Sequence, residues 1–229
     1  MPTGLGGEIM WLCPSLDDSP DDLSGNGNNG TYQNGMGTTS DTGSGGILAY
    51  DFDGTDDYIQ TTLSDTDYRS SNGNFTISGW YKTKNKYRSG KVFSDGAVEL
   101  GQESNFNRAS AAGLLPSSYQ NFLATSYPNS GFVWRHFLMV VEGGSIRAYE
   151  NGVLVITMLA GYGVNVNSQS YDARVGFRNG DTYALAYMDD IRAYSRVLTQ
   201  AEITLLASAR GILGGLGGTH THRTLLGVG

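Results

Sequence analysis

The chain has 229 residues, a single cysteine and a net charge of −7. A chain of this length can bury a core without metal or disulfide staples, so one domain is expected. Residues 1–70 hold eleven aspartates and one glutamate against one arginine. Nucleic-acid binding draws its affinity from clustered Lys and Arg, so we exclude nucleic acid as a partner. The lone Cys13 excludes an internal disulfide. It is expected to be a small buried residue, with a reactive thiol as the alternative.

No membrane segment is expected. The uninterrupted apolar runs, such as residues 137–141, are far shorter than the roughly 20 residues of a membrane-spanning helix. The first residues lack the basic patch and the apolar stretch of a secretory signal. This favours a protein that stays in the cytoplasm where it is made, or that leaves as part of something larger.

Short segments that alternate apolar and polar residues, separated by turn signals, predict an all-β fold. Residues 24–46 are mostly Gly, Asn, Ser and Thr and are expected to form a surface loop. Gly-Gly at 143–144 and Asn-Gly at 151–152 predict hairpin turns, because these residues accept positive φ. The predicted strands are 8–13, 47–52, 56–62, 74–83, 91–94, 97–101, 134–142, 145–150, 153–159, 171–178 and 184–194.

A helix is predicted directly after the last strand. Thr199 can cap it, and Glu202 three residues later completes a capping box in front of an apolar face. Residues 1–210 therefore form the predicted domain, and residues 211–229 form a Gly-rich apolar tail.

The three tryptophans are expected in the core. Trp11, Trp80 and Trp134 have neighbours that alternate with polar residues, so we predict that they lie buried between two antiparallel sheets.

Two segments carry a family resemblance. Residues 51–58, Asp-Phe-Asp-Gly-Thr-Asp-Asp-Tyr, and residues 186–203, which begin Ala-Tyr-Met-Asp-Asp-Ile-Arg-Ala-Tyr, resemble the opening and closing segments of laminin-G-like jelly rolls. These jelly rolls belong to the concanavalin A-like lectin and glucanase superfamily. The resemblance implies an antiparallel two-sheet jelly-roll sandwich with one short C-terminal helix and an extended tail. It leaves function open, because this fold hosts lectins, hydrolases and structural modules. The segments that fit the pattern before and between these two are 22–31, 75–81, 133–137 and 145–155.

Catalysis is not expected. Hydrolytic members of that superfamily carry carboxylates two or three residues apart on one strand, and glycoside hydrolysis needs carboxyl groups about 5–10 Å apart. Asp95, Glu99 and Glu103 are each four residues apart, which is about 13 Å along a strand. His136 is expected to be a packed or edge histidine, and the chain has no Gly-x-Ser-x-Gly nucleophile motif.

The resemblance implies a structural calcium ion. In relatives of this fold, calcium commonly bridges the start of the chain to an aspartate of the closing strand, and that aspartate matches Asp189. Asp53 is the second candidate ligand, since calcium prefers several oxygen donors. The alternative is that Asp189 and Asp190 bond to backbone amides and Arg192 without a metal.

A candidate glycan-binding loop lies in residues 104–130, which combine Tyr, Asn and Ser in the manner of adaptable recognition loops. Aromatic rings would supply contact area for a sugar, and small polar groups would supply hydrogen bonds. The alternative is that the rings pack within the sheets. The candidate residues are Tyr119, Asn121, Tyr127 and Asn129.

The tail indicates assembly. Residues 211–229 contain seven glycines and no acidic residue, with apolar residues at no helical spacing. Such an arm is expected to become ordered along a neighbouring subunit or to add a strand to its sheet. The predicted arm residues are Ile212, Leu213, Leu216, Leu225 and Leu226.

These features predict a non-enzymatic structural protein of a virion. The chain is similar to short jelly-roll proteins often found among tailed-phage structural proteins, so we expect a capsid decoration or surface protein. Its arm would contact other copies of the chain and a capsid or other shell protein, and its jelly roll could bind surface glycans. The alternative is a soluble or cell-surface carbohydrate-binding lectin module, extracellular rather than part of a virion. Calcium is the one cofactor expected.

Overall fold

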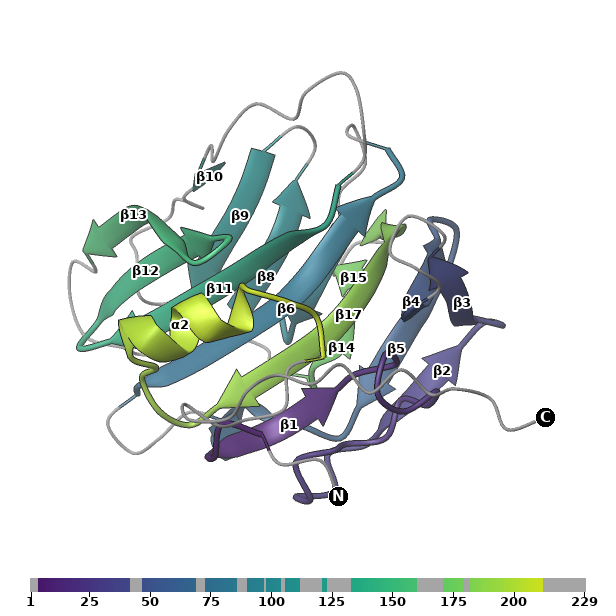
Figure 1. The fold of residues 1–229 in the computed structure, drawn as a ribbon, viewed down its shortest axis with the longest axis horizontal. Coiled ribbons are helices and arrows are strands. Elements are labelled where there is room, and N and C mark those ends of the chain that lie inside the picture. The colour runs from purple at the N-terminus through teal and green to yellow at the C-terminus, as the bar shows by residue number, and fades with distance from the viewer. Residues whose placement is uncertain are drawn as a thin grey trace.

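Two antiparallel β-sheets lie face to face in the computed structural model (Figure 1). The residues that the structure describes are 4–41, 47–68, 73–85, 90–96, 98–103, 106–111, 121–122, 133–159, 171–178 and 182–211. The architecture confirms the predicted all-β, two-sheet jelly roll with one short helix near the end of the domain.

The first sheet has eight strands in the order β13-β12-β11-β6-β17-β4-β3, and β1 also pairs with β17. Its long central strands are those that alternate most clearly in the sequence. The strands are β1 (Glu8–Leu12), β3 (Gly37–Asp41), β4 (Ile47–Asp53), β6 (Phe75–Thr83), β11 (Arg135–Glu142), β12 (Ser145–Glu150), β13 (Val153–Leu159) and β17 (Leu185–Tyr194).

The second sheet has seven strands in the order β10-β9-β8-β7-β14-β5-β2. A separate two-stranded hairpin, β15 (Phe177–Arg178) and β16 (Thr182–Tyr183), follows β14. The seven strands are β2 (Gly30–Gln33), β5 (Tyr58–Thr61), β7 (Gly90–Ser94), β8 (Val98–Glu103), β9 (Phe106–Ala111), β10 (Asn121–Phe122) and β14 (Arg174–Val175).

The main core lies between the sheets. On β6, Phe75, Ile77 and Tyr81 point inward, and Phe137 and Met139 do the same on β11. Successive side chains of a strand point to opposite faces, so the intervening residues of β6 and β11 face outward. Burial of each large apolar side chain contributes about 1.5–3 kcal/mol to folding.

A second, smaller core lies on the outer face of the eight-stranded sheet. There α2 (Gln200–Leu206) crosses over β6 and β11 (Figure 1), and its Ile203 and Leu206 pack on Leu138 and Val140. The predicted capping box is confirmed. Thr199 accepts from the Glu202 amide, and the Glu202 side chain accepts from the Thr199 amide.

The predicted burial of the tryptophans is confirmed for two of the three residues, but their predicted position between the two sheets is wrong. Trp11 and Trp80 are buried, but neither belongs to the core between the sheets. Trp80 lies under α2 and donates from Nε1 to the carbonyl of Leu206 at 3.2 Å. Trp134 is only half-buried. Trp80 lies outside the main core because successive side chains of β6 point to opposite faces of the sheet. Ile77 and Tyr81 occupy the inner face, so Trp80 lies on the outer one.

The predicted surface loop at 24–46 is also wrong in part, because β2 and β3 lie within it. Both lie at the end of a sheet, where a strand needs few buried side chains. Tyr32 of β2 packs against the main core, with its ring edge-on to that of Tyr50. The short helix α1 (Asp65–Tyr68) was not predicted either. The predicted strand 171–178 is broken at Gly176, whose φ is +85°. A Cβ there would lie 2.2 Å from the ring of Phe52.

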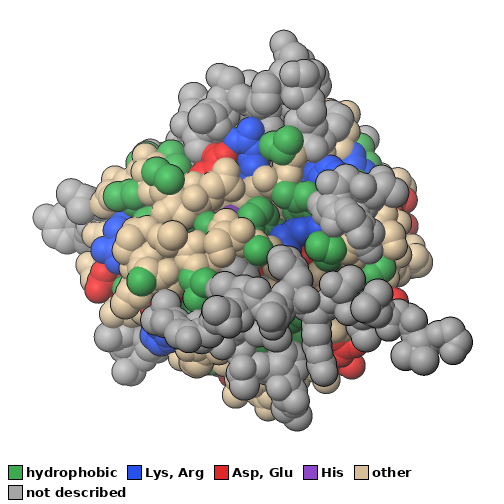
Figure 2. Space-filling view, in the orientation of Figure 1, with side chains coloured by type: hydrophobic (Ala, Val, Ile, Leu, Met, Phe, Trp, Pro, Cys, Tyr) green, Lys and Arg blue, Asp and Glu red, His purple; other side chains and the backbone are tan. Residues whose placement is uncertain are grey.

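Around α2, Figure 2 shows hydrophobic and charged side chains in small separate groups. On this side, the part of the chain that the structure describes presents no broad patch of either kind. No helix among the described residues is long and apolar enough to cross a membrane.

Candidate functional site

A row of polar residues crosses the outer face of the seven-stranded sheet. Ile59 and Val175 are paired and point into the core, so their strand neighbours point outward. Strand pairing then places one polar residue from each of five adjacent strands in line. This polar row consists of Thr31, Gln60, Arg174, Ser94 and Glu99.

Aromatic rings gather beside the middle of the polar row. The ring of Tyr58 on β5 lies 5.4 Å from that of Phe177 on β15, and Phe177 lies 5.3 Å from Tyr183 on β16. The guanidinium of Arg174 lies 4.4 Å from the ring centroid of Tyr171 and 4.8 Å from that of Phe177. We call Tyr58, Tyr171, Phe177 and Tyr183 the aromatic cluster.

The three tyrosines of the aromatic cluster and the near half of the polar row are partly open to solvent, whereas Phe177 is buried. Thr31 is exposed, and Gln60, Arg174, Tyr58 and the other two tyrosines are half-buried. Aromatic rings with exposed faces supply contact area for an apolar surface, and amide and guanidinium groups beside them supply directional hydrogen bonds. A pyranose or furanose ring offers C–H faces and hydroxyl edges that match both.

The other half of the polar row is buried and bonded within the protein. Glu99 is 6% exposed and its Oε2 lies 3.7 Å from the Nζ of Lys91. Asp95, in the turn between β7 and β8, accepts hydrogen bonds from the hydroxyl of Tyr68 and from the amide of Val98. Neither carboxylate is presented to solvent as an acid or a nucleophile. The side chain of Glu103 lies outside the described residues.

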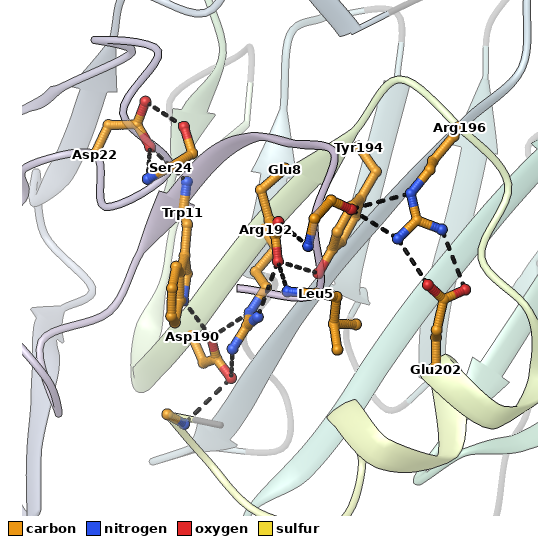
Figure 3. A network of polar contacts seen from close by, with 12 residues as sticks. Leu5, Glu8, Trp11, Asp22, Ser24, Asp190, Arg192, Tyr194, Arg196 and Glu202 are labelled. Atoms are coloured by element: carbon orange, nitrogen blue, oxygen red, sulfur yellow. Dashed lines mark hydrogen bonds and ion pairs between the residues drawn. The ribbon is translucent and has the colours of Figure 1, made fainter. Parts of the chain in front are cut away.

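Asp190 lies at the centre of a buried polar network (Figure 3). It occupies a bulge at φ +51°. Its carboxylate accepts from the indole of Trp11 at 2.7 Å and from Nε of Arg192 at 2.6 Å. Arg192 also lies 3.4 Å from Glu8, which accepts from backbone amides at the start of the chain. The network therefore fastens β1 to the closing strand β17.

Asp189 is fully buried beside this network. Its Oδ1 accepts from the hydroxyl of Ser15 at 3.1 Å and from the thiol of Cys13 at 3.5 Å, and its Oδ2 lies 3.5 Å from the guanidinium of Arg210. Burial and, to a smaller extent, the charge of Asp190 raise its pKa to about 7, against the opposing charge of Arg210.

The surroundings of Asp189 do not fit the calcium site that the resemblance implies. Calcium needs six to eight oxygen ligands, whereas Asp189 has a thiol, one hydroxyl and the guanidinium of Arg210 around it. Asp53 pairs with Leu185 on β17, four residues from Asp189, or about 13 Å along the strand. The structure therefore does not bring the two candidate ligands together.

Asp53 lies instead in an acidic group of its own. Ligand oxygens of Asp53, Asp56 and Asp57 lie within 4.8 Å of one another in the turn between β4 and β5. Burial raises the pKa of Asp57. Calcium at this turn stays a prediction.

The remaining predicted site residues fall largely outside the described part of the chain. Tyr119, Tyr127 and Asn129 lie there, as do the arm residues Ile212, Leu213, Leu216, Leu225 and Leu226. The backbone of Asn121 belongs to β10, the edge strand that pairs with β9.

The aromatic cluster was not predicted as a site. The sequence does indicate that the side chains of Tyr58 and Arg174 point away from the core, because each is next to an apolar residue that points into it. The pairing of β5 with β14 brings together residues 114 positions apart. No local pattern reports such a pairing.

A family model described as the concanavalin A-like lectin/glucanases superfamily, with laminin-G-type domains, matches residues 53–204. The chain belongs to this superfamily. A search of curated proteins finds no match.

Solved structures show the same fold at low sequence identity. Domain 4 of AbnA, an extracellular arabinanase from Geobacillus stearothermophilus, was solved with arabinotriose; the match has a TM-score of 0.64 at 15% identity and covers 90% of this chain and 100% of that domain. Botulinum neurotoxin type C, whose cell entry depends on interaction with two ganglioside molecules, matches with a TM-score of 0.66 at 16% identity. The binding domain of Paraclostridial mosquitocidal protein 1 matches with 0.63 at 16%. Each toxin match covers 88% of this chain, which spans about half of the toxin chains, 50% and 52%.

Proposed function

We propose that this chain is a non-enzymatic glycan-binding module, and that it holds its ligand on the open half of the polar row beside the aromatic cluster. The observation that carries the proposal is the joint position of exposed ring faces and hydrogen-bonding groups, Gln60 and Arg174, on one sheet face. Sugar binding needs both kinds of group at one place.

Two of the matched proteins support this choice of ligand class. The arabinanase domain was solved with arabinotriose, and cell entry of the matched neurotoxin depends on interaction with two ganglioside molecules. The arabinanase match is one domain of a larger enzyme and the mosquitocidal match is a binding domain, which fits a module that displays a recognition face. Asp95 and Glu99, the carboxylates considered above as catalytic candidates, interact with other groups of the protein.

Binding measurements with matched variants test the proposal. We would titrate the full chain with a panel of neutral and acidic oligosaccharides, arabinotriose included, by calorimetry. Tyr58→Ala should weaken binding of any ligand found by about tenfold, because a stacked ring contributes about 1 kcal/mol beyond its buried area.

Tyr187→Ala is the matched control. Tyr187 is a half-buried tyrosine of the other sheet, with the ammonium of Lys84 4.2 Å from its ring centroid. It should bind as the unmodified chain does. Equal affinities of the Tyr58 variant and the unmodified chain would contradict the location, and failure of the whole panel to bind would contradict the function.

An assembly role in a virion stays the second proposal, because the start of the tail is held at a defined place. The amide of Gly211 donates to Asp190 at 3.2 Å, and Arg210 pairs with Asp189. An arm that begins at this fixed point could attach the domain to a capsid or other shell protein, or to a second copy of the chain. Glycan binding and attachment by the arm use different parts of the chain and are compatible.

A further inference from the structure

We infer that the binding face selects an oligosaccharide that carries a carboxylate, as sialic and uronic acids do, and that Arg174 is the residue that recognises it. This inference rests on the proposed glycan-binding function and names the ligand class of the same site.

Arg174 differs from the other arginines of the molecule. Six arginine side chains lie in the part of the chain that the structure describes, and five of them form ion pairs with a carboxylate. Those five are Arg135, Arg147, Arg192, Arg196 and Arg210. Arg174 has no acidic partner among the described residues, although the chain carries a net charge of −7.

The guanidinium of Arg174 is nevertheless held in a fixed position. Its Nε donates to Oε1 of Gln60 at 2.7 Å. Its plane lies near three rings, with centroid distances of 5.4 Å to Tyr58, 4.4 Å to Tyr171 and 4.8 Å to Phe177. Such contacts orient the group without neutralising it. The two terminal nitrogens donate no hydrogen bond to any residue that the structure describes.

An oriented guanidinium with both terminal nitrogens available matches a carboxylate. Arginine presents N–H donors in a planar fork that pairs with the two carboxylate oxygens, and such charge-assisted pairs are roughly twice as strong as neutral hydrogen bonds. The ring faces beside it can contact the sugar that bears the carboxylate. A neutral sugar would use the rings and leave the charge unpaired.

The charge of the surroundings favours one carboxylate over a polyanion. Asp56 and Asp57 directly precede Tyr58, and Asp53 lies with them in the same turn. A ligand with many negative charges would be repelled by this turn and by the acidic N-terminal part of the chain. A single acidic sugar within an otherwise neutral oligosaccharide would not.

The experiment compares matched acidic and neutral sugars. The probes are 3′-sialyllactose against lactose, and a neutral trisaccharide carrying a single uronate residue against its methyl ester, titrated into the full chain at physiological salt. The acidic member of at least one pair should bind about tenfold or more tightly than its neutral partner, which is the size of one charge-assisted contact. Arg174→Gln should abolish that difference between the acidic and the neutral member of the pair.

Two further variants separate recognition from structure. Arg174→Lys keeps the charge but loses the fork and should retain only part of the preference. Arg147→Gln removes a partly exposed arginine on β12 of the other sheet and should bind as the unmodified chain does. If Arg174→Gln fails to fold, the ester pair still tests the inference with the unmodified protein.

The outcomes distinguish the inference from the proposed function. Equal binding of acidic and neutral members of both pairs, or a preference that survives Arg174→Gln, overturns the inference and leaves glycan binding in place. No binding by any acidic or neutral sugar overturns both.

Discussion

Arg192 shows how single buried charges hold the closing strand. It is fully buried between Asp190 and Glu8, and its guanidinium lies 4.1 Å from the ring centroid of Trp11. A buried charge is costly unless it is paired and hydrogen-bonded. Arg192 meets both conditions, and its partners come from the start of the chain and from β17. Arg210 supplies the same kind of neutralisation to Asp189.

If Arg210 takes the place of a metal, chelation should leave the melting temperature unchanged. Arg210→Ala should instead lower the free energy of unfolding by about 1–3 kcal/mol, since it strips a buried carboxylate oxygen of its partner. Arg147→Ala, at a partly exposed pair, should cost at most about 1 kcal/mol. Thermal and urea unfolding with and without chelator measure both effects. A chelator-induced drop that disappears in Asp189→Asn would instead place calcium at Asp189, and one that disappears in Asp53→Asn would place it in the β4–β5 turn.

His136 should make the protein less stable in acid. It is 1% exposed and lies beside Trp80 with the two rings tilted by 55°, and burial lowers its pKa to about 4. The unfolded chain has a histidine pKa near 6.5, so it binds more protons than the folded chain between about pH 6.5 and 4. Falling pH through this window should remove up to about 3 kcal/mol of stability.

The contribution of His136 must be isolated, because Asp189 acts in the opposite direction. The raised pKa of Asp189 makes the folded state bind more protons between about pH 7 and 4. We therefore expect the stability difference between the unmodified chain and His136→Phe to fall as pH is lowered from 7 to 4. A difference that stays constant across urea denaturations at these pH values would contradict a buried neutral histidine.

Among the elements, α2 shows most clearly which stabilising interactions are local in sequence and which are tertiary. Its capping box and the neighbouring pair of Glu202 with Arg196 are local, and they hold the pKa of Glu202 at about 2. Its burial is tertiary, because Ile203 and Leu206 cover apolar residues on the outer face of β11. The helix is seven residues long. Since isolated helices of that length are unstable, packing contributes most of its stability.

Loss of the cap should have a moderate effect. Thr199→Ala should cost about 1 kcal/mol, or about 2–4 °C in melting temperature for a domain of this size. Thr204→Ala is the control, because Thr204 is exposed in the same helix and bonds only to the neighbouring turn. It should change stability little. A cost for Thr204→Ala equal to that of Thr199→Ala would show that the capping box has no special role.

The elements predicted from the sequence are those whose signal is local. β6, β12 and β17 carry alternating segments and β11 carries an uninterrupted apolar run, within strands of six to ten residues. The Asn-Gly turn and the capping box each lie within four residues. β2 and β3 give weak signals because their edge positions and short lengths leave few side chains to bury. The site depends on β5 lying beside β14, and this pairing is a tertiary outcome. Sequence reasoning therefore placed Tyr58 and Phe177 on strands, left Tyr183 outside them, and could not bring these residues together.

At the scale of the whole molecule, the two sheet faces differ. α2 and the turn around Ser15 lie on the outer face of the eight-stranded sheet, whereas the β2–β5–β14 part of the seven-stranded sheet keeps half-exposed polar and aromatic groups. With the proposed function, this asymmetry separates a stabilising side from a recognition side. The tail begins on the stabilising side, next to Asp190, so attachment by the arm would leave the recognition side free.

Deletion of residues 212–229 tests the assembly role. The domain should stay folded, because α2 and the Arg210 contact remain, and its melting temperature should change little. Self-association or attachment to a shell protein should be lost if the arm provides it, as sedimentation of the two proteins would show. An unchanged oligomeric state and unchanged attachment would contradict assembly by the arm and leave the lectin-like function.

Amide chemical-shift mapping with a bound oligosaccharide tests the central claim most directly. A ligand from the binding panel would be titrated into isotope-labelled full-length chain. The account predicts that the largest shifts fall on β5, β14 and the β15–β16 hairpin, with the sugar unaltered throughout. Shifts centred on α2 and β11, or the appearance of sugar hydrolysis products, would contradict it.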